Sequence, residues 1–201
     1  MKKNELLRIA IVGVGWAGAR HVEAVREPGR PIEVAALVDS DARHLEETAV
    51  RFGIGQTYAS LEPTLMDEGI DAIDIATPHS LHLEMAVAAA KAGKHVLVEK
   101  PMALNVPDAT AMISAADANG VKLFVAENVA YEPQIEFLRD VVRSGDLIGP
   151  VTSASVSGGF RARGEYGYPG RRAWLAEPDQ GGTGIWMLNG IHTVAGLRRV
   201  F

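Results

Sequence analysis

The chain contains no cysteine among its 201 residues. This absence excludes disulfide bonds, thiolate nucleophiles and cysteine zinc sites together, and it leaves the redox compartment open. An excess of positive charge is also lacking, because 20 lysines and arginines stand against 25 aspartates and glutamates, for a formal net charge of −5. Since no basic stripe is available to neutralise a phosphate backbone, we expect no nucleic-acid partner.

A long hydrophobic run is missing as well, even at the amino terminus, where basic residues precede an apolar stretch. Glu5 and Arg8 interrupt this stretch, and glycines end it after about half a dozen residues, which is too short for a signal sequence or a membrane span. The composition, 47% hydrophobic and 22% charged, is that of an ordinary globular chain. We therefore expect a soluble, cytoplasmic protein with no membrane partner.

What the sequence does contain is a regular alternation of short apolar runs with segments of helical period. The runs are rich in β-branched residues, as is typical of strands buried on both faces of a parallel sheet. Candidate strands are 8–12, 33–38, 72–75, 95–98 and 121–126, and candidate helices are 16–27, 41–53, 80–93 and 106–120. The pattern predicts a doubly wound α/β fold with a parallel sheet.

The rhythm changes after Ala126, and we expect a domain boundary there, with residues 1–126 as one domain and 127–201 as the beginning of another. A helix-like segment, 132–145, is followed by an alternating segment, 150–160, and by a loop rich in glycine, arginine and tyrosine. The last residues look helical and stop without a cap or a breaker. This ending suggests the front part of a longer protein or a truncated product.

Three glycines follow the first candidate strand at the spacing G-x-G-x-x-G: Gly13, Gly15 and Gly18. In such a loop the first glycine makes a tight turn, the second lets the backbone approach a pyrophosphate, and the third lets a helix pack on a strand. Trp16 and Ala17 fill the variable positions, and Trp16 is expected to lie over the pyrophosphate. The pattern alone is weak, since a tight turn needs only one of the glycines.

Asp39 strengthens the nucleotide interpretation because it ends the second candidate strand, about 20 residues after Gly18. A carboxylate there can accept hydrogen bonds from both hydroxyls of an adenosine ribose. Its charge would repel a 2′-phosphate, so NAD is favoured over NADP. Ser40 and Arg43 keep NADP open, since a hydroxyl and a guanidinium can recruit a phosphate. The alternative is a glycine turn and a surface acid that bind nothing.

A second candidate is Lys100, which follows the apolar run 95–98 together with Glu99 and precedes Pro101. Ligands of doubly wound sheets sit beyond the carboxyl ends of the strands, so this lysine should lie at the same edge as the glycine loop. Its ammonium can donate to a substrate oxygen there or share its proton. Pro101 restricts the lysine through an extended backbone or a cis bond. From spacing alone, a surface Lys–Glu pair before a proline explains these residues at least equally well.

The order of five segments decides between these interpretations. The glycine fingerprint, ATPHSLH, AGKHVLVEKP, GDLIGPV and GGTGIWMLNGIH together resemble the Gfo/Idh/MocA family of oxidoreductases over essentially the whole chain. Glu-Lys-Pro is the most specific of these motifs. The resemblance implies an amino-terminal Rossmann domain, a carboxyl-terminal α/β domain built on a large open sheet, and hydride transfer between nicotinamide and a sugar, cyclitol or related alcohol.

The resemblance also implies roles for particular residues. Lys100 matches the catalytic lysine of the family, and Glu99 matches its neighbour on the nucleotide side. Thr77, Pro78 and His82 match the loop that lines the nicotinamide ribose. The cofactor-binding residues implied by the glycine motif and the resemblance are therefore Gly13, Gly15, Trp16, Ala17, Gly18, Asp39, Thr77, Pro78, His82, Glu99 and Lys100.

The substrate end departs from the family pattern, which usually carries an aspartate four residues before a histidine. His192 matches the histidine, but Leu188 stands at the aspartate position, Asn189 lies one place out of register, and Ala195 replaces a further acid. In alcohol oxidation a base takes the hydroxyl proton and a donor binds the oxygen, roles that suit His192 and Lys100. Without a carboxylate partner, His192 is expected to lack the group that orients it. A histidine packed at a helix start is the structural alternative.

Other residues are weaker candidates. Asn128 and Tyr131 follow the last candidate strand and can reach substrate, whereas His79 and His82 can form a metal pair at i, i+3. No third ligand is spaced to complete such a pair, so we expect no metal. Four arginines are expected to be solvated, although they can receive an acidic or phosphorylated sugar: Arg161, Arg163, Arg171 and Arg172. Trp174 and Trp186 are expected to pack.

These observations predict an NAD-dependent oxidoreductase that acts on a sugar-like alcohol and forms a homo-oligomer at full length. The competing hypothesis is a catalytically silent dinucleotide-binding sensor or regulator. Loss of the aspartate at Leu188 favours the sensor, whereas retention of Lys100 and His192 opposes it.

Overall fold

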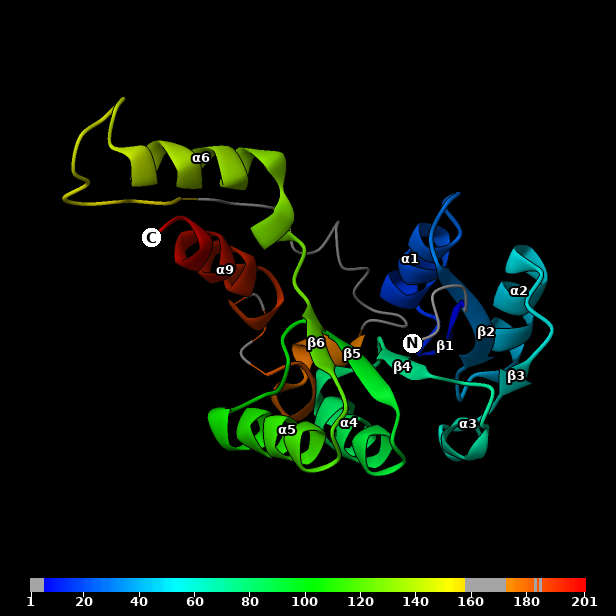
Figure 1. The fold of residues 1–201 in the computed structure, drawn as a ribbon. Helices are drawn as coiled ribbons and strands as arrows, with labels where there is room; N and C mark the ends of the chain where they lie inside the picture. The colour runs from blue at the N-terminus through cyan, green and yellow to red at the C-terminus, as the bar shows by residue number, and fades with distance from the viewer. Residues whose placement is uncertain (1–5, 158–172, 183, 185) are drawn as a thin grey trace. The chain divides into compact units, whose positions relative to one another are not determined.

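The structure is a computed structural model, and it describes residues 6–157, 173–182, 184 and 186–201. Its contacts divide the chain into two compact units, residues 1–125 and residues 126–201, named unit 1 and unit 2 below. Unit 1 carries the parallel sheet, and unit 2 is helical in its described part (Figure 1).

Unit 1 is built on a six-stranded sheet in the order β3-β2-β1-β4-β5-β6. β1 pairs in parallel with both β2 and β4, so the strand order reverses beside β1. This arrangement is the predicted doubly wound fold, in which ligands bind at the point of reversal. The strands are β1 (Leu7–Val12), β2 (Ile32–Val38), β3 (Thr57–Tyr58), β4 (Ala72–Ile75), β5 (His95–Glu99) and β6 (Leu123–Ala126).

Five helices connect these strands and cover the two faces of the sheet. They are α1 (Trp16–Val25), α2 (Ala42–Phe52), α3 (Glu62–Met66), α4 (His82–Lys91) and α5 (Val106–Ala118), with a short 3-10 turn, η1 (His79–Leu81), before α4. α4 and α5 lie side by side, and α1 and α2 lie over β1 and β2 (Figure 1). Asp41 and Asn105 cap α2 and α5 by accepting hydrogen bonds from the backbone N–H groups three residues on.

The hydrophobic core has two layers because successive residues of a strand face opposite sides of the sheet. Ile9 and Ile11 of β1 pack with Val22 of α1 in one cluster. Ala10 and Val12 pack in the other cluster, which includes Met112 of α5. Both faces of the central strands are thus buried, which explains why the strands read as continuous apolar runs.

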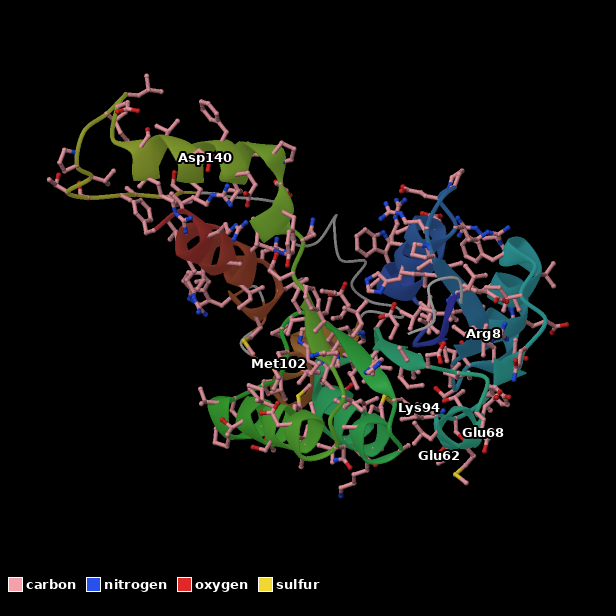
Figure 2. All side chains as sticks on the ribbon, in the orientation of Figure 1. Arg8, Glu62, Glu68, Lys94, Met102 and Asp140 are labelled. Atoms are coloured by element: carbon pink, nitrogen blue, oxygen red, sulfur yellow. The ribbon has the colours of Figure 1, made fainter. Side chains whose placement is uncertain are left out.

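The end of the sheet opposite the ligand edge is held by two basic side chains, both labelled in Figure 2. Lys94 is 9% exposed, and its Nζ donates to the carbonyl oxygens of Asp67 and Ile70 at 2.7 Å each. Arg8 donates to the carbonyl oxygen of Gly69 at 2.8 Å. These bonds fix the turn between α3 and β4.

Unit 2 contains, after the end of β6, the elements η2 (Val129–Tyr131), α6 (Pro133–Ser144), η3 (Ala173–Ala176), α8 (Pro178–Gly181), a π-helical turn η4 (Trp186–Gly190) and α9 (Ile191–Val200). α9 packs on α6, where Arg199 meets Glu136 at 2.6 Å. The alternating segment forms no strand over its described residues, 150–157. The loop that holds Arg161, Arg163, Arg171 and Arg172 lies outside the described residues.

The described part of unit 2 therefore has no strand after β6, and the large open sheet implied by the resemblance is not seen there. Among the described helices of the whole chain, none combines the length and the apolar character needed to cross a membrane.

Candidate functional site

The glycine loop after β1 shows a steric reason for two of its three glycines. Gly13 has φ +85°, and a Cβ there would lie 2.7 Å from the carbonyl oxygen of Ala76. A Cβ on Gly18 would collide with the carbonyl oxygen of Gly13, where α1 crosses the loop. A Cβ on Gly15 would meet nothing within 4 Å. The fold thus requires Gly13 and Gly18, whereas the space beside Gly15 is open to a ligand.

Gly15 is also the N-cap of α1, and no side chain caps this helix end. The N–H groups of the first helical turn and the positive end of the helix dipole suit a pyrophosphate. Ala17 lies in this first turn. Trp16 is 66% exposed, and its ring lies 5.7 Å from the guanidinium carbon of Arg20. Its predicted place over a pyrophosphate stays a prediction.

Asp39 lies directly after β2 and is tied to the glycine loop. Its Oδ2 accepts a hydrogen bond from the N–H of Val14 at 3.0 Å, and its Oδ1 accepts one from the N–H of Asp41 at 2.9 Å. His44 of α2 adds a second tie, because its Nε2 lies 2.9 Å from the carbonyl oxygen of Val14. Each carboxylate oxygen of Asp39 has a further lone pair, so both can still accept a ribose hydroxyl.

Arg43, the residue that kept NADP open, is engaged elsewhere. Its Nε donates to Glu47 of the same helix at 2.8 Å, and the side-chain hydrogen bond to Glu47 raises the pKa of this guanidinium. Both side chains are exposed, so the pair is weak and separates readily. In the arrangement seen, the negative charge of Asp39 is the fixed feature at the end of β2.

The register of the sheet brings three predicted site segments to one edge. Val12 lies opposite Ile75, and Ile75 lies opposite Val98. The carboxyl ends of these three strands therefore bring together the glycine loop, the loop through Thr77 and Pro78, and the end of β5 at Glu99 with the next residue, Lys100. The peptide bond between Lys100 and Pro101 is cis, one of the two backbone alternatives predicted for it.

Behind Lys100 lies a charged triad that the sequence did not reveal. His21 of α1 stands between two carboxylates: its Nδ1 donates to Asp74 of β4 at 2.8 Å, and its Nε2 donates to Glu99 at 3.1 Å. The second oxygen of Glu99 accepts the N–H of Lys100 at 2.9 Å. The sequence analysis singled out Glu99 but neither His21 nor Asp74, although Asp74 is the one charged residue of the otherwise apolar β4.

The triad shifts the pKa values of all three of its members. Burial alone would lower the pKa of His21, but hydrogen bonds to Asp74 and Glu99 outweigh it and raise this pKa to about 10. Burial raises the pKa of Asp74, whereas Glu99, although buried, has its pKa lowered by His21 and Lys100. An imidazolium therefore holds the ionised Glu99, which in turn holds the backbone of Lys100.

The loop after β4 leads to His82. This histidine is expected to line the nicotinamide ribose, and its side chain is fully buried. Its two ring nitrogens face the carbonyl oxygens of Pro101 and Thr77, at 3.0 Å and 3.1 Å. Burial lowers the pKa of His82 in spite of these carbonyl groups. His82 thus joins the loop after β4 to the turn after Lys100, and its place in the cofactor site stays a prediction.

Thr77 and Pro78 remain at the ligand edge, half-buried, with the Thr77 hydroxyl 3.6 Å from the sulfur of Met85. His79, the other half of the suggested metal pair, is buried, and its ring centroid lies 5.7 Å from that of His82. The described residues contain no group of three histidine, aspartate or glutamate side chains that could hold a metal ion.

In unit 2, the structure corrects the expectation that His192 has no carboxylate partner. Nδ1 of His192, in the first turn of α9, lies 2.7 Å from Oε1 of Glu127. Glu127 directly follows β6, 65 residues earlier in the chain. The family pattern places the acid in the same helix as the histidine, where this chain has Leu188, so it gives no indication of a carboxylate at a strand end. His192 is therefore oriented, although by a different residue.

The weaker substrate candidates also lie in unit 2. Asn128 and Tyr131 are exposed at η2, close in sequence to Glu127, and Asn189 lies half-buried in η4. Leu188 is also half-buried in η4. η2 contacts α9, so Asn128, Tyr131 and His192 come from neighbouring elements.

Residues 7–127 match the model of the oxidoreductase family with an NAD-binding Rossmann fold, Gfo/Idh/MocA. The chain belongs to this family. It is 34% identical to D-apiose dehydrogenase from Paraburkholderia graminis over 141 aligned residues. The alignment covers 70% of this chain and 37% of that protein. It is also 34% identical to scyllo-inositol 2-dehydrogenase (NADP(+)) from Bacillus subtilis, over 67% of this chain and 40% of the relative.

Solved structures extend the similarity into unit 2. The crystal structure of GenD2 from gentamicin A biosynthesis, in complex with NAD, superposes with a TM-score of 0.82 and 27% sequence identity. The match covers 98% of this chain and 54% of GenD2. The chain thus spans about half, or less, of the length of the relatives named here.

The residues of this Gfo/Idh/MocA chain fit the cofactor of the family. The open side of Gly15 and the uncapped start of α1 suit the pyrophosphate, and the Asp39 carboxylate suits the adenosine ribose. Thr77, Pro78 and Glu99 border the edge at which the nicotinamide half would continue. The contacts themselves stay predictions.

Proposed function

We propose that this protein is an NAD-dependent oxidoreductase that transfers hydride between nicotinamide and a secondary alcohol of a sugar, cyclitol or related compound. The observation that carries the proposal is the position of Lys100. It follows β5 at the sheet edge where the glycine loop opens, and Glu99 and the charged triad hold its backbone. A cation built into a ligand edge in this way is suited to a substrate oxygen.

The substrate class rests on the relatives, whose names include D-apiose dehydrogenase and scyllo-inositol 2-dehydrogenase. NAD is the proposed cofactor because Asp39 places a fixed negative charge where NADP carries its 2′-phosphate. One relative is named for NADP(+), so the preference for NAD over NADP is tested directly below.

The chemistry of the proposal assigns two protein groups. His192 takes the hydroxyl proton of the alcohol at its Nε2, because Nδ1 faces Glu127. The Lys100 ammonium donates a hydrogen bond to the same oxygen as it becomes a carbonyl. NAD, when bound, supplies the acceptor for the hydride that leaves the carbinol carbon. In the reverse direction the same two groups return the proton and polarise the carbonyl.

The hypothesis of a catalytically silent sensor loses the observation that favoured it. It was favoured by the absence of an aspartate at Leu188, but Glu127 supplies a carboxylate to His192 at 2.7 Å. The oriented histidine therefore supports the oxidoreductase.

The nucleotide half of the proposal is tested by fluorescence titration with NADH and, separately, with NADPH. We expect NADH to bind more tightly than NADPH, and Asp39→Ala to weaken NADH binding at least about tenfold, since a hydrogen bond to a charged group contributes roughly 1.5–3 kcal/mol. Asp117→Ala, which removes an exposed carboxylate of α5, is the matched control and should bind like wild type. Equal binding to wild type and Asp39→Ala would contradict this assignment.

The chemical half is tested by turnover with a panel of sugar and cyclitol alcohols. We expect Lys100→Ala to lower kcat at least about 100-fold, because general acid–base and electrostatic groups contribute on this scale. NADH binding should change much less, which separates a catalytic role from a cofactor role. Wild-type turnover in Lys100→Ala would contradict the catalytic role of Lys100, whereas tight NADH binding with no turnover of any alcohol would favour the silent sensor.

A further inference from the structure

The contact between Glu127 and His192 has features of a built pair. The Glu127 side chain is 14% exposed, and that of His192 is 26% exposed. Oε1 of Glu127 takes two bonds, one from Nδ1 of His192 at 2.7 Å and one from the N–H of Val129 at 3.0 Å. The bond to Val129 fixes the carboxylate to the turn after β6, so the histidine meets an acceptor that is already in place.

The same carboxylate is a poor choice for stability. Its Oε2 is buried and has no hydrogen-bond partner in the part of the chain that the structure describes. A buried, half-satisfied carboxylate costs free energy, and an apolar or amide side chain of similar volume avoids this cost. The charge of Glu127 is therefore better explained by its contact with His192 than by stability.

We propose that Glu127 is the positioning residue of His192: it holds the imidazole in one tautomer and stabilises the positive charge that His192 gains when it takes a proton. The inference rests on the proposed function, because it assigns a partner to the proposed base. It adds a residue that neither the resemblance nor the sequence pattern indicated.

The geometry assigns the tautomer. An ionised carboxylate only accepts hydrogen bonds, so the proton of the neutral imidazole must sit on Nδ1. Nε2 then carries the lone pair that takes a proton from an alcohol: the O–H bond breaks, an N–H bond forms at Nε2, and the other ring proton stays on Nδ1, hydrogen-bonded to Glu127. The imidazolium that results faces a carboxylate at hydrogen-bond distance, as in other histidine–carboxylate pairs.

Both partners are held by elements beyond their own contact. Glu127 is fixed by the turn that leads from β6 into η2. His192 lies in the first turn of α9, and α9 is fastened to α6 by the ion pair of Arg199 with Glu136. Glu136 also pairs with Arg139, so its charge is compensated and does not compete for the histidine.

The first test is a spectroscopic signature that does not depend on turnover. Nitrogen-15 NMR of the histidine side chains, with the His192 signal assigned from its loss in His192→Gln, reports which ring nitrogen carries the proton. We expect the Nδ1–H tautomer in wild type and a return to the Nε2–H tautomer of free histidine in Glu127→Ala. An Nε2–H tautomer in wild type, or the same tautomer in both proteins, would overturn the proposal.

The second test separates orientation from charge by kinetics. We expect Glu127→Ala to lower kcat about 10- to 100-fold with KM little changed, because misorientation of a reacting group costs on this scale. Glu127→Gln keeps an acceptor for Nδ1–H but removes the charge, so its loss should be smaller. Glu132→Gln, a neutralised glutamate of the same segment, is the control and should turn over like wild type.

Thermal unfolding of the same variants excludes a purely structural role. We expect Glu127→Gln to keep or raise the midpoint while activity falls, since it removes a buried charge. A lowered midpoint with unchanged kcat would assign Glu127 to stability and overturn the positioning role. If wild type itself turns over no alcohol, the proposed function fails, and the NMR signature still decides whether Glu127 sets the tautomer of His192.

Discussion

The most perturbed group at the candidate site is His21, a histidine that touches neither of the proposed reacting groups directly. Its pKa is about 10 in the folded chain and about 6.5 when unfolded, because Asp74 and Glu99 bind its charged form. The stabilisation is therefore complete below pH 6.5 and is lost as the pH rises through 10. Between these values, folding takes up a proton.

We predict that the free energy of unfolding of wild type falls between pH 7 and pH 10, and that His21→Gln is less stable at pH 7 by roughly 3 kcal/mol but loses less over this range. The reason is that the variant leaves two buried carboxylates without their cation, and such losses are typically 3–5 kcal/mol. Urea unfolding at a series of pH values measures both effects. His95→Gln replaces an exposed histidine and should retain the wild-type slope. A parallel decline in wild type and His21→Gln would contradict the charged triad.

Single residues were also where sequence reasoning succeeded least. Glu127 and His192 are 65 positions apart, and His21 and Glu99 are 78 apart. A pattern search within one helix or motif does not join residues at such separations. His82 is a related case: its motif predicts a place beside the cofactor, and the structure adds that its buried ring faces two carbonyl groups. Contacts that depend on packing between distant elements leave no local spacing to read.

At the scale of the element, the glycine loop separates binding from folding. A Cβ on Gly15 meets open space, so Gly15→Ala should fold normally, yet its methyl group would stand where a pyrophosphate approaches the backbone. We predict a loss of NADH affinity of about tenfold or more with an unchanged thermal midpoint. Fluorescence titration and thermal unfolding measure the two quantities.

Gly18→Ala is the matched comparison in the same loop. Its Cβ would collide with the carbonyl oxygen of Gly13, so α1 must shift away from β1. We predict a destabilisation of roughly 1–3 kcal/mol, the usual cost of overpacking, together with weaker NADH binding. Wild-type affinity in Gly15→Ala, or wild-type stability in Gly18→Ala, would contradict the division of roles between the two glycines.

The elements themselves were predicted well where periodicity was strong. Five strands and their order of alternation with helices followed from continuous apolar runs, which are clearest in β1, β2 and β4, where both faces are buried. β3 and α3 were missed. β3 has only two residues, and α3 has five with a proline in its first turn, so neither is long enough to show a period.

At the scale of the whole molecule, the chain is divided into two compact units, and the proposed nucleotide contacts all come from the first. The proposed base and its positioning carboxylate come from the second. Cofactor binding and proton transfer are thus assigned to parts of the chain with separate internal contacts. A ligand that binds one folded unit stabilises that unit by mass action.

We therefore predict two thermal transitions in calorimetry, of which NADH raises one. At a concentration of 100 times the dissociation constant, NADH contributes about 2.7 kcal/mol, which corresponds to a shift of roughly 10 °C for a unit of this size. Ile73→Ala removes a fully buried side chain of unit 1 and identifies its transition by lowering it, whereas Val200→Ala identifies that of unit 2. The NADH-dependent shift should fall on the transition that Ile73→Ala lowers and should shrink in Asp39→Ala. A shift confined to the transition that Val200→Ala lowers would show that NADH binds unit 2. This result would contradict the assignment of the glycine loop as the nucleotide site.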